Sequence, residues 1–198
     1  CWAVQASPMT MRDPLHCLLV TGIFPPDVGG PARFIPGLAL QLRENRIRCS
    51  VVTLSDELSH ADSFPFPVHL IRRRRNYGIR MAATIREILR RCRDADVVFA
   101  NGLHFEAAVA ASIARKPLVT KFVGDEIWER ANLRGWYRDD VMSFQSFRDW
   151  KVEPFRLMRG YALRASKRVV VPSRFTRELV ETWTERPLPL DIVPNAVE

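Results

Sequence analysis

Glycines, carboxylates and a histidine stand where the apolar segments of this chain end. The first group is a Pro/Gly loop that closes with Gly29 and Gly30 and follows the apolar run at 17–20. A helix is predicted to begin directly after the loop, so backbone N–H groups there can face an anion. A tight turn without a ligand is the alternative, and no G-x-G-x-x-G dinucleotide motif occurs in the chain.

Polar residues also follow three later apolar segments. They are Asn101 and His104, then Asp125 and Glu126, and finally Ser173 and Arg174. Carboxylates in this position suit hydroxyl binding or proton transfer. Helix capping by Asp125, a structural role for His104 and a solvent-facing Arg174 are the alternatives. Together with Glu129, His104 and Glu126 form no recognisable metal-ligand set, so no metal site is predicted.

The elements that must position these residues alternate along the chain. Strands are predicted at 16–20, 48–54, 68–71, 95–100, 117–123, 167–171 and 190–193, and helices at 31–43, 77–93, 106–115, 153–165 and 173–183. Residues 126–150 are aromatic and charged but lack periodicity, so no element is predicted there. The alternation favours an α/β fold with a doubly wound, mainly parallel Rossmann-like sheet, in which ligands bind beyond the carboxyl ends of the strands.

Composition is that of an ordinary globular domain. The 198 residues are 47% hydrophobic and 26% charged, without the run of about 18 apolar residues that a membrane span needs. Residues 1–14 have no signal-peptide core and are expected to be a disordered leader or added sequence. The four cysteines, Cys1, Cys17, Cys49 and Cys92, show no CxxC spacing, which favours buried free thiols in the cytosol.

Arginines carry most of the net charge of +8. The cluster comprises Arg72, Arg73, Arg74, Arg75, Arg86 and Arg90. Such a face suits an anionic partner, above all a membrane surface, while an ordinary solvated face is the alternative. Nucleic acid is not predicted as a partner, because aromatic side chains are not interleaved with the run apart from Tyr77.

Five segments resemble, in this order, the N-terminal domain of the family 4 glycosyltransferases, which have the GT-B fold. They are TGIFPPDVGGPARFIPGLALQL (21–42), ANGLHFEAAVAA (100–111), TKFVGDEIWERA (120–131), VVVPSRFTRELVETW (169–183) and IVPNAVE (192–198). The resemblance covers residues 15–198.

The resemblance implies an enzyme of two Rossmann-like domains that face each other across a cleft. The N-terminal domain holds a saccharide or lipid-linked acceptor, and the C-terminal domain holds the nucleotide-sugar. The sugar is transferred with retention of configuration and without a metal or other cofactor. Residues 15–198 correspond to the acceptor side, and the C-terminal donor domain is expected to be absent from this chain, which alone would be inactive. A role in cell-envelope polysaccharide synthesis, in the cytoplasm and peripherally on the inner face of the membrane, is the corresponding expectation.

The resemblance also suggests residue roles. Gly29 and Gly30 would approach the donor diphosphate, and Asp125 would be the catalytic residue. Ser173 and Arg174 would face the interdomain cleft. The predicted acceptor-binding residues are Asp27, Asn101, His104, Glu126 and Trp128. A turn-stabilising Asp27 and a core Trp128 are the alternatives. Many relatives carry His where Gly124 stands, so a histidine contact is not expected at that position.

A second hypothesis is a non-catalytic Rossmann-like module that binds an anionic lipid, a membrane surface or a protein partner. A second domain with a glutamate pair following residue 198 would favour the enzyme. A basic nucleic-acid binder ranks third.

Overall fold

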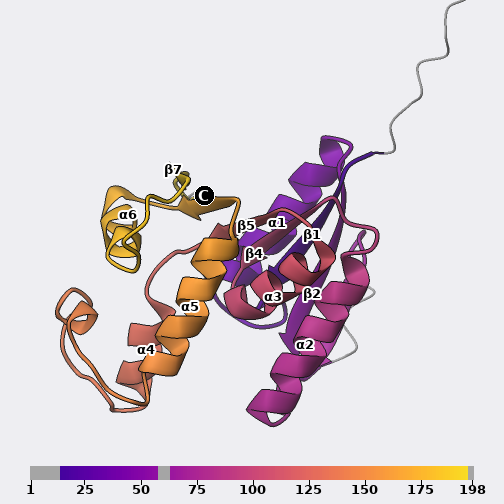
Figure 1. The fold of residues 1–198 in the computed structure, drawn as a ribbon. Coiled ribbons are helices and arrows are strands. Elements are labelled where there is room, and N and C mark those ends of the chain that lie inside the picture. Colours follow the sequence, from indigo (N-terminus) through magenta and orange to yellow (C-terminus); the bar gives the residue numbers. More distant parts are fainter. Residues whose placement is uncertain (1–13, 58–62, 196–198) are drawn as a thin grey trace, which may run out of the picture.

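One parallel sheet organises the chain, with strands in the order β3-β2-β1-β4-β5-β6-β7 (Figure 1). The computed structural model describes residues 14–57 and 63–195. The expectation for a leader at 1–14 therefore lies outside the described residues except for Pro14. The strands are β1 (His16–Thr21), β2 (Arg48–Ser55), β3 (Val68–Arg72), β4 (Val97–Asn101), β5 (Leu118–Lys121), β6 (Arg168–Val171) and β7 (Leu190–Ile192).

Five predicted helices connect these strands. They are α1 (Gly30–Glu44), α2 (Tyr77–Arg91), α3 (His104–Ala114), α5 (Glu153–Ala165) and α6 (Arg174–Glu181). Every strand pair is parallel, so the prediction of a doubly wound α/β sheet is confirmed. The order of strands reverses beside β1, which pairs with β2 on one side and with β4 on the other.

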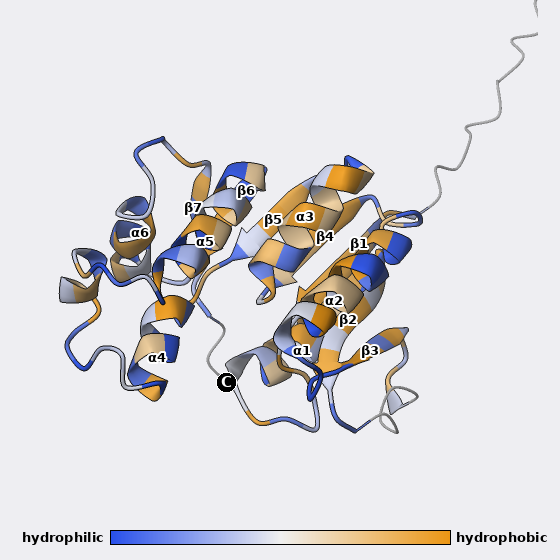
Figure 2. Ribbon diagram, turned by 60° about the horizontal axis from the view of Figure 1, so that its bottom comes forward, coloured by the Kyte–Doolittle hydropathy of each residue, from blue (hydrophilic) through white to orange (hydrophobic). Residues whose placement is uncertain are grey.

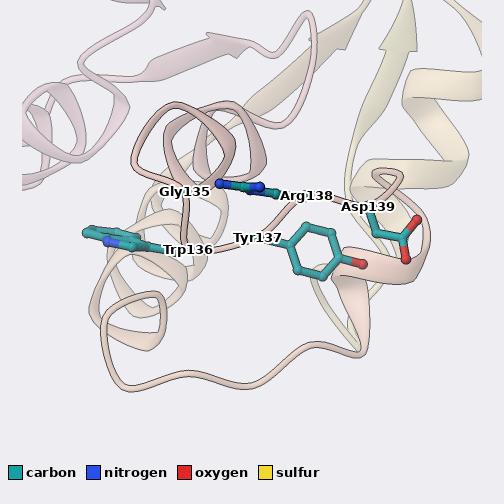
Figure 3. Close-up of a pocket in the computed structure, with 5 residues that line it drawn as sticks. All are labelled: Gly135, Trp136, Tyr137, Arg138 and Asp139. Atoms are coloured by element: carbon teal, nitrogen blue, oxygen red, sulfur yellow. The ribbon is translucent and has the colours of Figure 1, made fainter.

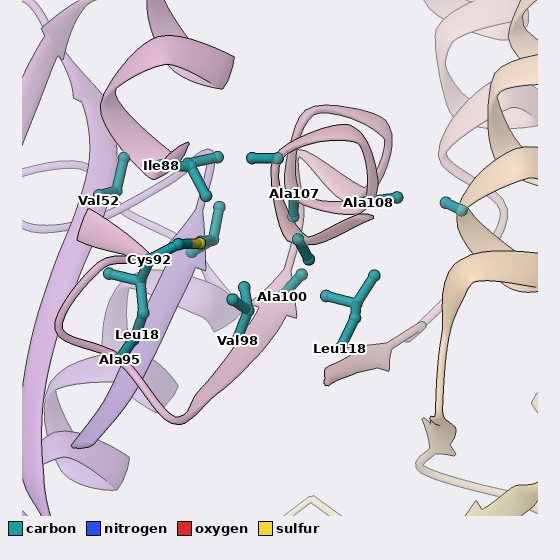
Figure 4. Packing of buried hydrophobic residues seen from close by; sticks show 14 of the residues in the cluster. Leu18, Val52, Ile88, Cys92, Ala95, Val98, Ala100, Ala107, Ala108 and Leu118 are labelled. Carbon is teal, nitrogen blue, oxygen red and sulfur yellow. The ribbon is translucent and has the colours of Figure 1, made fainter. Parts of the chain in front are cut away.

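The larger core lies between the sheet and helices α2, α3 and α5 (Figure 4). Leu18, Val98 and Leu118 point from the strands toward Ile88 and the alanines of α3. Because the alanines have short side chains, α3 packs close to the sheet; Ala107, Ala108, Ala110 and Ala111 are at most 1% exposed.

A second core covers the opposite face, where α1 packs. Leu19 of β1 and Val51 of β2 meet Ile35 and Ala39 of α1. In Figure 2 the central strands β1, β2 and β4 carry the hydrophobic colour, as strands buried on both faces must.

The connection from β5 to α5 contains elements that periodicity did not predict. Helix α4 (Glu126–Leu133) follows β5 directly, and the short 3-10 helix η2 (Ser143–Gln145) comes before α5. Ile127, Ala131, Phe144 and Val152 form a separate small core there. Figure 1 shows this connection projecting away from the sheet beside α4 and α5.

Candidate functional site

The carboxyl ends of β1 and β4 meet at the point where the strand order reverses, which is where ligands bind in open parallel sheets. Gly22 follows β1 and Gly102 follows β4. A Cβ added to Gly102 would lie 3.1 Å from the Gly22 nitrogen, and Gly102 has φ +120°. The two backbones therefore approach as closely as glycine allows, and no side chain from Gly22 or Gly102 covers this edge.

The predicted glycine loop lies at the start of α1, as expected. Gly29 is the N-cap residue, Pro31 occupies the first turn, and no side chain caps the first N–H groups. The first turn contains no acidic residue, and a Cβ on Gly30 would meet nothing within 4 Å. The N-terminus of α1 thus presents uncapped N–H groups, which favour an anion.

Asp27, predicted to bind an acceptor, forms an ion pair with Arg73. Arg73 also donates to the carbonyl oxygen of Gly22, at 3.2 Å, and to that of Leu54, at 3.0 Å. The hydrogen bond from Arg73 holds the pKa of Asp27 below its usual value. In this structure Asp27 fixes the loop after β1 to the ends of β2 and β3, which agrees with the alternative of a turn-stabilising aspartate.

His104 lies at the start of α3 and is 7% exposed. Its ring stacks on Phe122, with the ring centroids 4.1 Å apart. Nε2 lies 3.0 Å from the Lys121 carbonyl oxygen and 3.2 Å from the Gly102 nitrogen, and Nδ1 lies 3.3 Å from a carboxylate oxygen of Glu126. The side chain thus ties the carboxyl ends of β4 and β5 and the start of α4 together from within.

Nδ1 faces the Glu126 carboxylate, while Nε2 has both an acceptor, the Lys121 carbonyl oxygen, and a donor, the Gly102 N–H, within reach. Burial lowers the pKa of His104, but the charge of Glu126 and the hydrogen bond to it outweigh burial, so the pKa is raised. Burial tends to raise the pKa of Glu126, but His104 reverses this and the pKa is lowered. Glu126 is therefore ionised near neutral pH. Its side chain is 49% exposed, so it is accessible to a ligand.

Asp125, predicted as the catalytic residue, is 2% exposed. Its Oδ1 accepts from the backbone nitrogens of Ile127 and Trp128 at 3.0 and 3.1 Å, and from Nη1 of Arg159 at 2.8 Å. Its Oδ2 accepts from Nε2 of Gln145 at 3.0 Å. The carboxylate caps α4 and joins it to η2 and α5, so no part of it faces an open site in this structure.

Of the other predicted site residues, Asn101, Trp128 and Ser173 are held within the domain and Arg174 is exposed. Asn101, the last residue of β4, is buried. Trp128 is partly buried beside the α4 core and donates its indole N–H to the Asp139 carbonyl oxygen at 2.9 Å. Ser173 accepts a hydrogen bond from the Thr176 nitrogen at 3.1 Å, so its predicted capping of α6 is confirmed. Arg174 follows at the same edge and is exposed.

Three residues near Glu126 were not predicted as site residues. Burial raises the pKa of Glu106 in α3, and the charge of Glu126 adds to the effect. Burial also raises the pKa of Tyr77 at the start of α2, with Glu106 adding to it. Arg80 packs on the Tyr77 ring, 5.4 Å from its centroid. The signal for Glu106 was its position two residues after His104, and the signal for Tyr77 and Arg80 was the start of α2 directly after β3, whose carboxyl end lies at the same edge.

The arginine run is not one uniform face. Arg73 is bound as described, and Arg74 lies 3.4 Å from a carboxylate oxygen of Asp56. Among the described residues, four arginines of the predicted cluster have no ion-pair partner and are exposed: Arg72, Arg75, Arg86 and Arg90.

Two open hollows lie away from the strand ends. One, of about 560 Å³, is lined by Gly135–Asp139 in the connection after α4 (Figure 3). The other, of about 580 Å³, is lined by Arg164 of α5 and residues 182–186 after α6. Neither hollow is lined by Glu126 or by the start of α1. The candidate site is therefore assigned to the carboxyl ends of the strands, because the polar residues and the reversal of strand order meet there.

The described part of the chain contains neither a metal-ligand cluster nor a helix that could span a membrane. No three His, Cys, Asp or Glu side chains gather there closely enough to hold a metal ion. Within residues 14–57 and 63–195, every helix is too short or too polar to cross a bilayer.

The sequence profile named Glycosyltransferase Family 4 matches residues 28–198, from the glycine loop to the last residue. The chain belongs to glycosyltransferase family 4. The resemblance seen in the strand-end motifs is thereby confirmed for most of the chain. No curated protein sequence matches this family 4 chain.

Solved structures share the fold of this family 4 domain. Anabaena HepE in complex with UDP-glucose superposes with a TM-score of 0.63 at 16% identity, covering 93% of this chain and 44% of HepE. A Listeria monocytogenes protein assigned as a UDP-N-acetylglucosamine 2-epimerase gives 0.60 at 14% identity, covering 89% and 44%. LpCGTa in complex with UDP gives 0.60 at 12% identity, covering 93% and 53%. The chain thus spans about half the length of these structures, and the likeness shows the fold alone.

Proposed function

We propose that this family 4 chain is the acceptor-side domain of a glycosyltransferase that moves a sugar from a nucleotide-sugar to a saccharide or lipid-linked acceptor. The family match over residues 28–198 is the observation that carries the proposal. Two of the similar structures hold UDP or UDP-glucose, which supports a nucleotide-sugar as donor. The donor-binding half is proposed to lie in a second domain outside these residues.

Glu126 is proposed to bind the acceptor. Its ionised, half-exposed carboxylate stands at the carboxyl edge of the sheet, and buried His104 holds it by a contact of 3.3 Å. A carboxylate in this position accepts a hydrogen bond from a hydroxyl group and orients the oxygen toward a donor sugar across the cleft. When the hydroxyl oxygen bonds to the anomeric carbon, the bond from that carbon to the phosphate oxygen breaks. The nucleoside diphosphate leaves with the electron pair, and the hydroxyl proton passes to the released phosphate oxygen.

The test uses the complete gene product and a panel of UDP-, GDP- and ADP-sugars. Consumption of one donor with formation of a glycoside supports the proposal, and no consumption or binding of any donor contradicts it. Glu126→Gln is expected to raise KM for the acceptor about tenfold or more, in line with the loss of a charge-assisted hydrogen bond. Glu178→Gln, on an exposed position of α6, is the matched control and should leave KM unchanged.

Retention of configuration and independence of metal ions belong to the same proposal, and the family resemblance supports both. NMR of the first-formed product distinguishes retention from inversion. Activity that survives EDTA supports metal independence, and activity that EDTA abolishes contradicts it.

The free arginines support a second element of the proposal, an anionic membrane surface that carries a lipid-linked acceptor. Arg72 and Arg75 precede α2, and Arg86 and Arg90 lie along it. Exposed cations of this kind bind anionic lipid in a salt-dependent way. Binding to vesicles with phosphatidylserine, lost in the Arg86→Gln/Arg90→Gln variant or in vesicles of phosphatidylcholine alone, supports this element; equal binding by the variant contradicts it.

A further inference from the structure

Lys121 is a buried cation without an anionic partner among the described residues. It ends β5 at the carboxyl edge of the sheet and is 3% exposed. Within residues 14–57 and 63–195, Nζ makes no hydrogen bond or ion pair; its close contact is the Phe34 ring, whose centroid is 3.7 Å away. Burial lowers the pKa of Lys121, with no neighbouring carboxylate to oppose it. Among the described residues Nζ is not one of the side-chain atoms that are both fully buried and unbonded, so the ammonium keeps a small opening to solvent.

The side chain of Lys121 lies on the face of the sheet that α1 covers. Leu118 and Thr120 pair with Val98 and Ala100, and Leu118 belongs to the core under α3. Because side chains alternate along a strand, Val119 and Lys121 must point to the opposite face. The contact with Phe34 of α1 agrees with this assignment.

Phe34 places the ammonium close to the uncapped end of α1. It lies four residues after Gly30, about one helical turn of 5.4 Å from the helix start. Helical side chains lean toward the N-terminus of their helix, so the ring extends toward the first turn. The contact with Phe34 therefore places the ammonium beside the first half of α1, whose first N–H groups no side chain caps and no acidic residue neutralises.

We propose that Lys121 and the N-terminus of α1 bind the same diphosphate group. Each is an electropositive group that the described residues leave without an anion, and they converge on one edge of the sheet from two elements. The Phe34 ring keeps the ammonium in place while the site is empty. The assignment rests on the proposed function, because it deepens the nucleotide-sugar site, and it adds a binding residue from β5 to the glycine loop.

The first test is titration of the 198-residue chain with inorganic pyrophosphate, followed by calorimetry and by thermal unfolding. Wild-type protein is expected to bind pyrophosphate and to gain thermal stability from it. Lys121→Met should bind at least tenfold more weakly while remaining folded, and Lys167→Met, an exposed lysine before β6, should bind as the wild type does. A structural lysine would give the opposite pattern: Lys121→Met would unfold at lower temperature and keep its affinity, which overturns the proposal.

The pH dependence gives a readout on the wild-type chain, independent of the variant. Pyrophosphate affinity should fall as the pH rises and the ammonium loses its proton. Because the pKa of Lys121 is lowered, this fall should occur at a lower pH than for an ordinary lysine. Burial is the cause of the lowered pKa of Lys121, and no charged side chain of the described residues contributes to it. NMR of the lysine Nζ signals should show Lys121 shifting on addition of pyrophosphate. A Lys121 signal that does not move overturns the proposal even if Lys121→Met fails to fold.

The complete gene product separates this inference from the proposed function. If Lys121→Met raises KM for the nucleotide-sugar, the diphosphate is that of the donor; if it raises KM for a lipid-linked acceptor alone, the diphosphate is that of the acceptor. If the enzyme transfers sugar with both KM values unchanged, the inference fails and the function stands. If no donor is consumed although Lys121 binds pyrophosphate, the function fails and the anion site stands.

Discussion

The Nδ1 atom of His104 lies 3.3 Å from a carboxylate oxygen of Glu126, and the two side chains differ sharply in exposure, 7% against 49%. One partner is thus held inside the domain while the other reaches the surface. His104 stacks on Phe122 and contacts the Lys121 carbonyl oxygen, so the imidazole has little freedom. The direction of the Glu126 carboxylate is therefore set from within the fold.

This pair predicts a pH window for stability. The pKa of His104 is raised, so its contribution is complete at low pH and is lost as pH rises through the folded-state pKa. The pKa of Glu126 is lowered, so its contribution is lost as pH falls through the folded-state pKa. Between these two pKa values, Glu126→Gln should lower the free energy of unfolding by about 1 kcal/mol or less, because the Glu126 side chain is half exposed. Urea unfolding at several pH values measures this, with NMR titration of His104; an unchanged His104 pKa in the variant would contradict the pairing.

The buried ion pair of Asp125 and Arg159 predicts a large loss of stability when the carboxylate is removed. Their side chains are 0% and 5% exposed, and Asp125 also caps α4. Asp125→Ala leaves the Arg159 charge buried and should cost about 3–5 kcal/mol of unfolding free energy. Glu178→Ala on the surface of α6 is the control and should change stability by less than about 0.5 kcal/mol. Equal denaturation midpoints for Asp125→Ala and wild type would show that the carboxylate is not structural.

The close approach of Gly102 to Gly22 predicts that a single methyl group disturbs the strand ends. Gly102 has φ +120° and its Cβ would lie 3.1 Å from the Gly22 nitrogen. Gly102→Ala should therefore lower the unfolding free energy by about 1–3 kcal/mol. Gly37→Ala is the matched control, because Gly37 lies inside α1 with nothing within 4 Å of its Cβ, and it should stabilise the fold by about 0.5–1 kcal/mol. Thermal unfolding measures the stability of both variants. Similar changes in stability for Gly102→Ala and Gly37→Ala would contradict the close approach of Gly102 to Gly22.

Arg73 is expected to behave unlike the other arginines of its run. Arg73→Lys loses the branched donors that reach Asp27 and the carbonyl oxygens of Gly22 and Leu54, at a cost of about 1–2 kcal/mol. Because the pKa of Asp27 is lowered, the part of this stability that comes from the ion pair should disappear as pH falls through that value. Arg75→Lys, on an exposed neighbour, should have no measurable effect in the same unfolding experiment.

The sequence predicted the sheet and its connections well where periodicity is strong. Helix α5 begins and ends at the predicted residues, and β1 extends only one residue past its predicted end. Helix α4 was missed because it has eight residues and buries only Ile127 and Ala131. Its stabilising partners, Phe144 and Val152, come from the irregular segment that follows, so the local sequence carries no helical pattern.

The site was predicted in position more than in detail. Strand-end reasoning identified Gly29, Gly30 and Glu126, because parallel strands bring their carboxyl ends to one edge. It did not predict that Asp125 is buried while Glu126 is half exposed, since the burial of Asp125 depends on Arg159, which is 34 residues away. Nor did it predict that Arg73 forms an ion pair while Arg72 is exposed. That difference arises because β3 ends at Arg72, and the sequence does not fix the last residue of a strand.

The small core of α4 and η2 gives residues 126–152 a folding unit of their own. Its buried residues, Ile127, Ala131, Phe144 and Val152, belong to neither of the two clusters that pack on the sheet. The segment is joined to its surroundings by packing against Phe155 of α5 and by polar contacts, among them the one from Trp183 to Gln145. Its amide protons should therefore exchange with solvent together and sooner than those of β1 and β4. Changes in the length or sequence of this segment are therefore expected to leave the sheet beneath it intact.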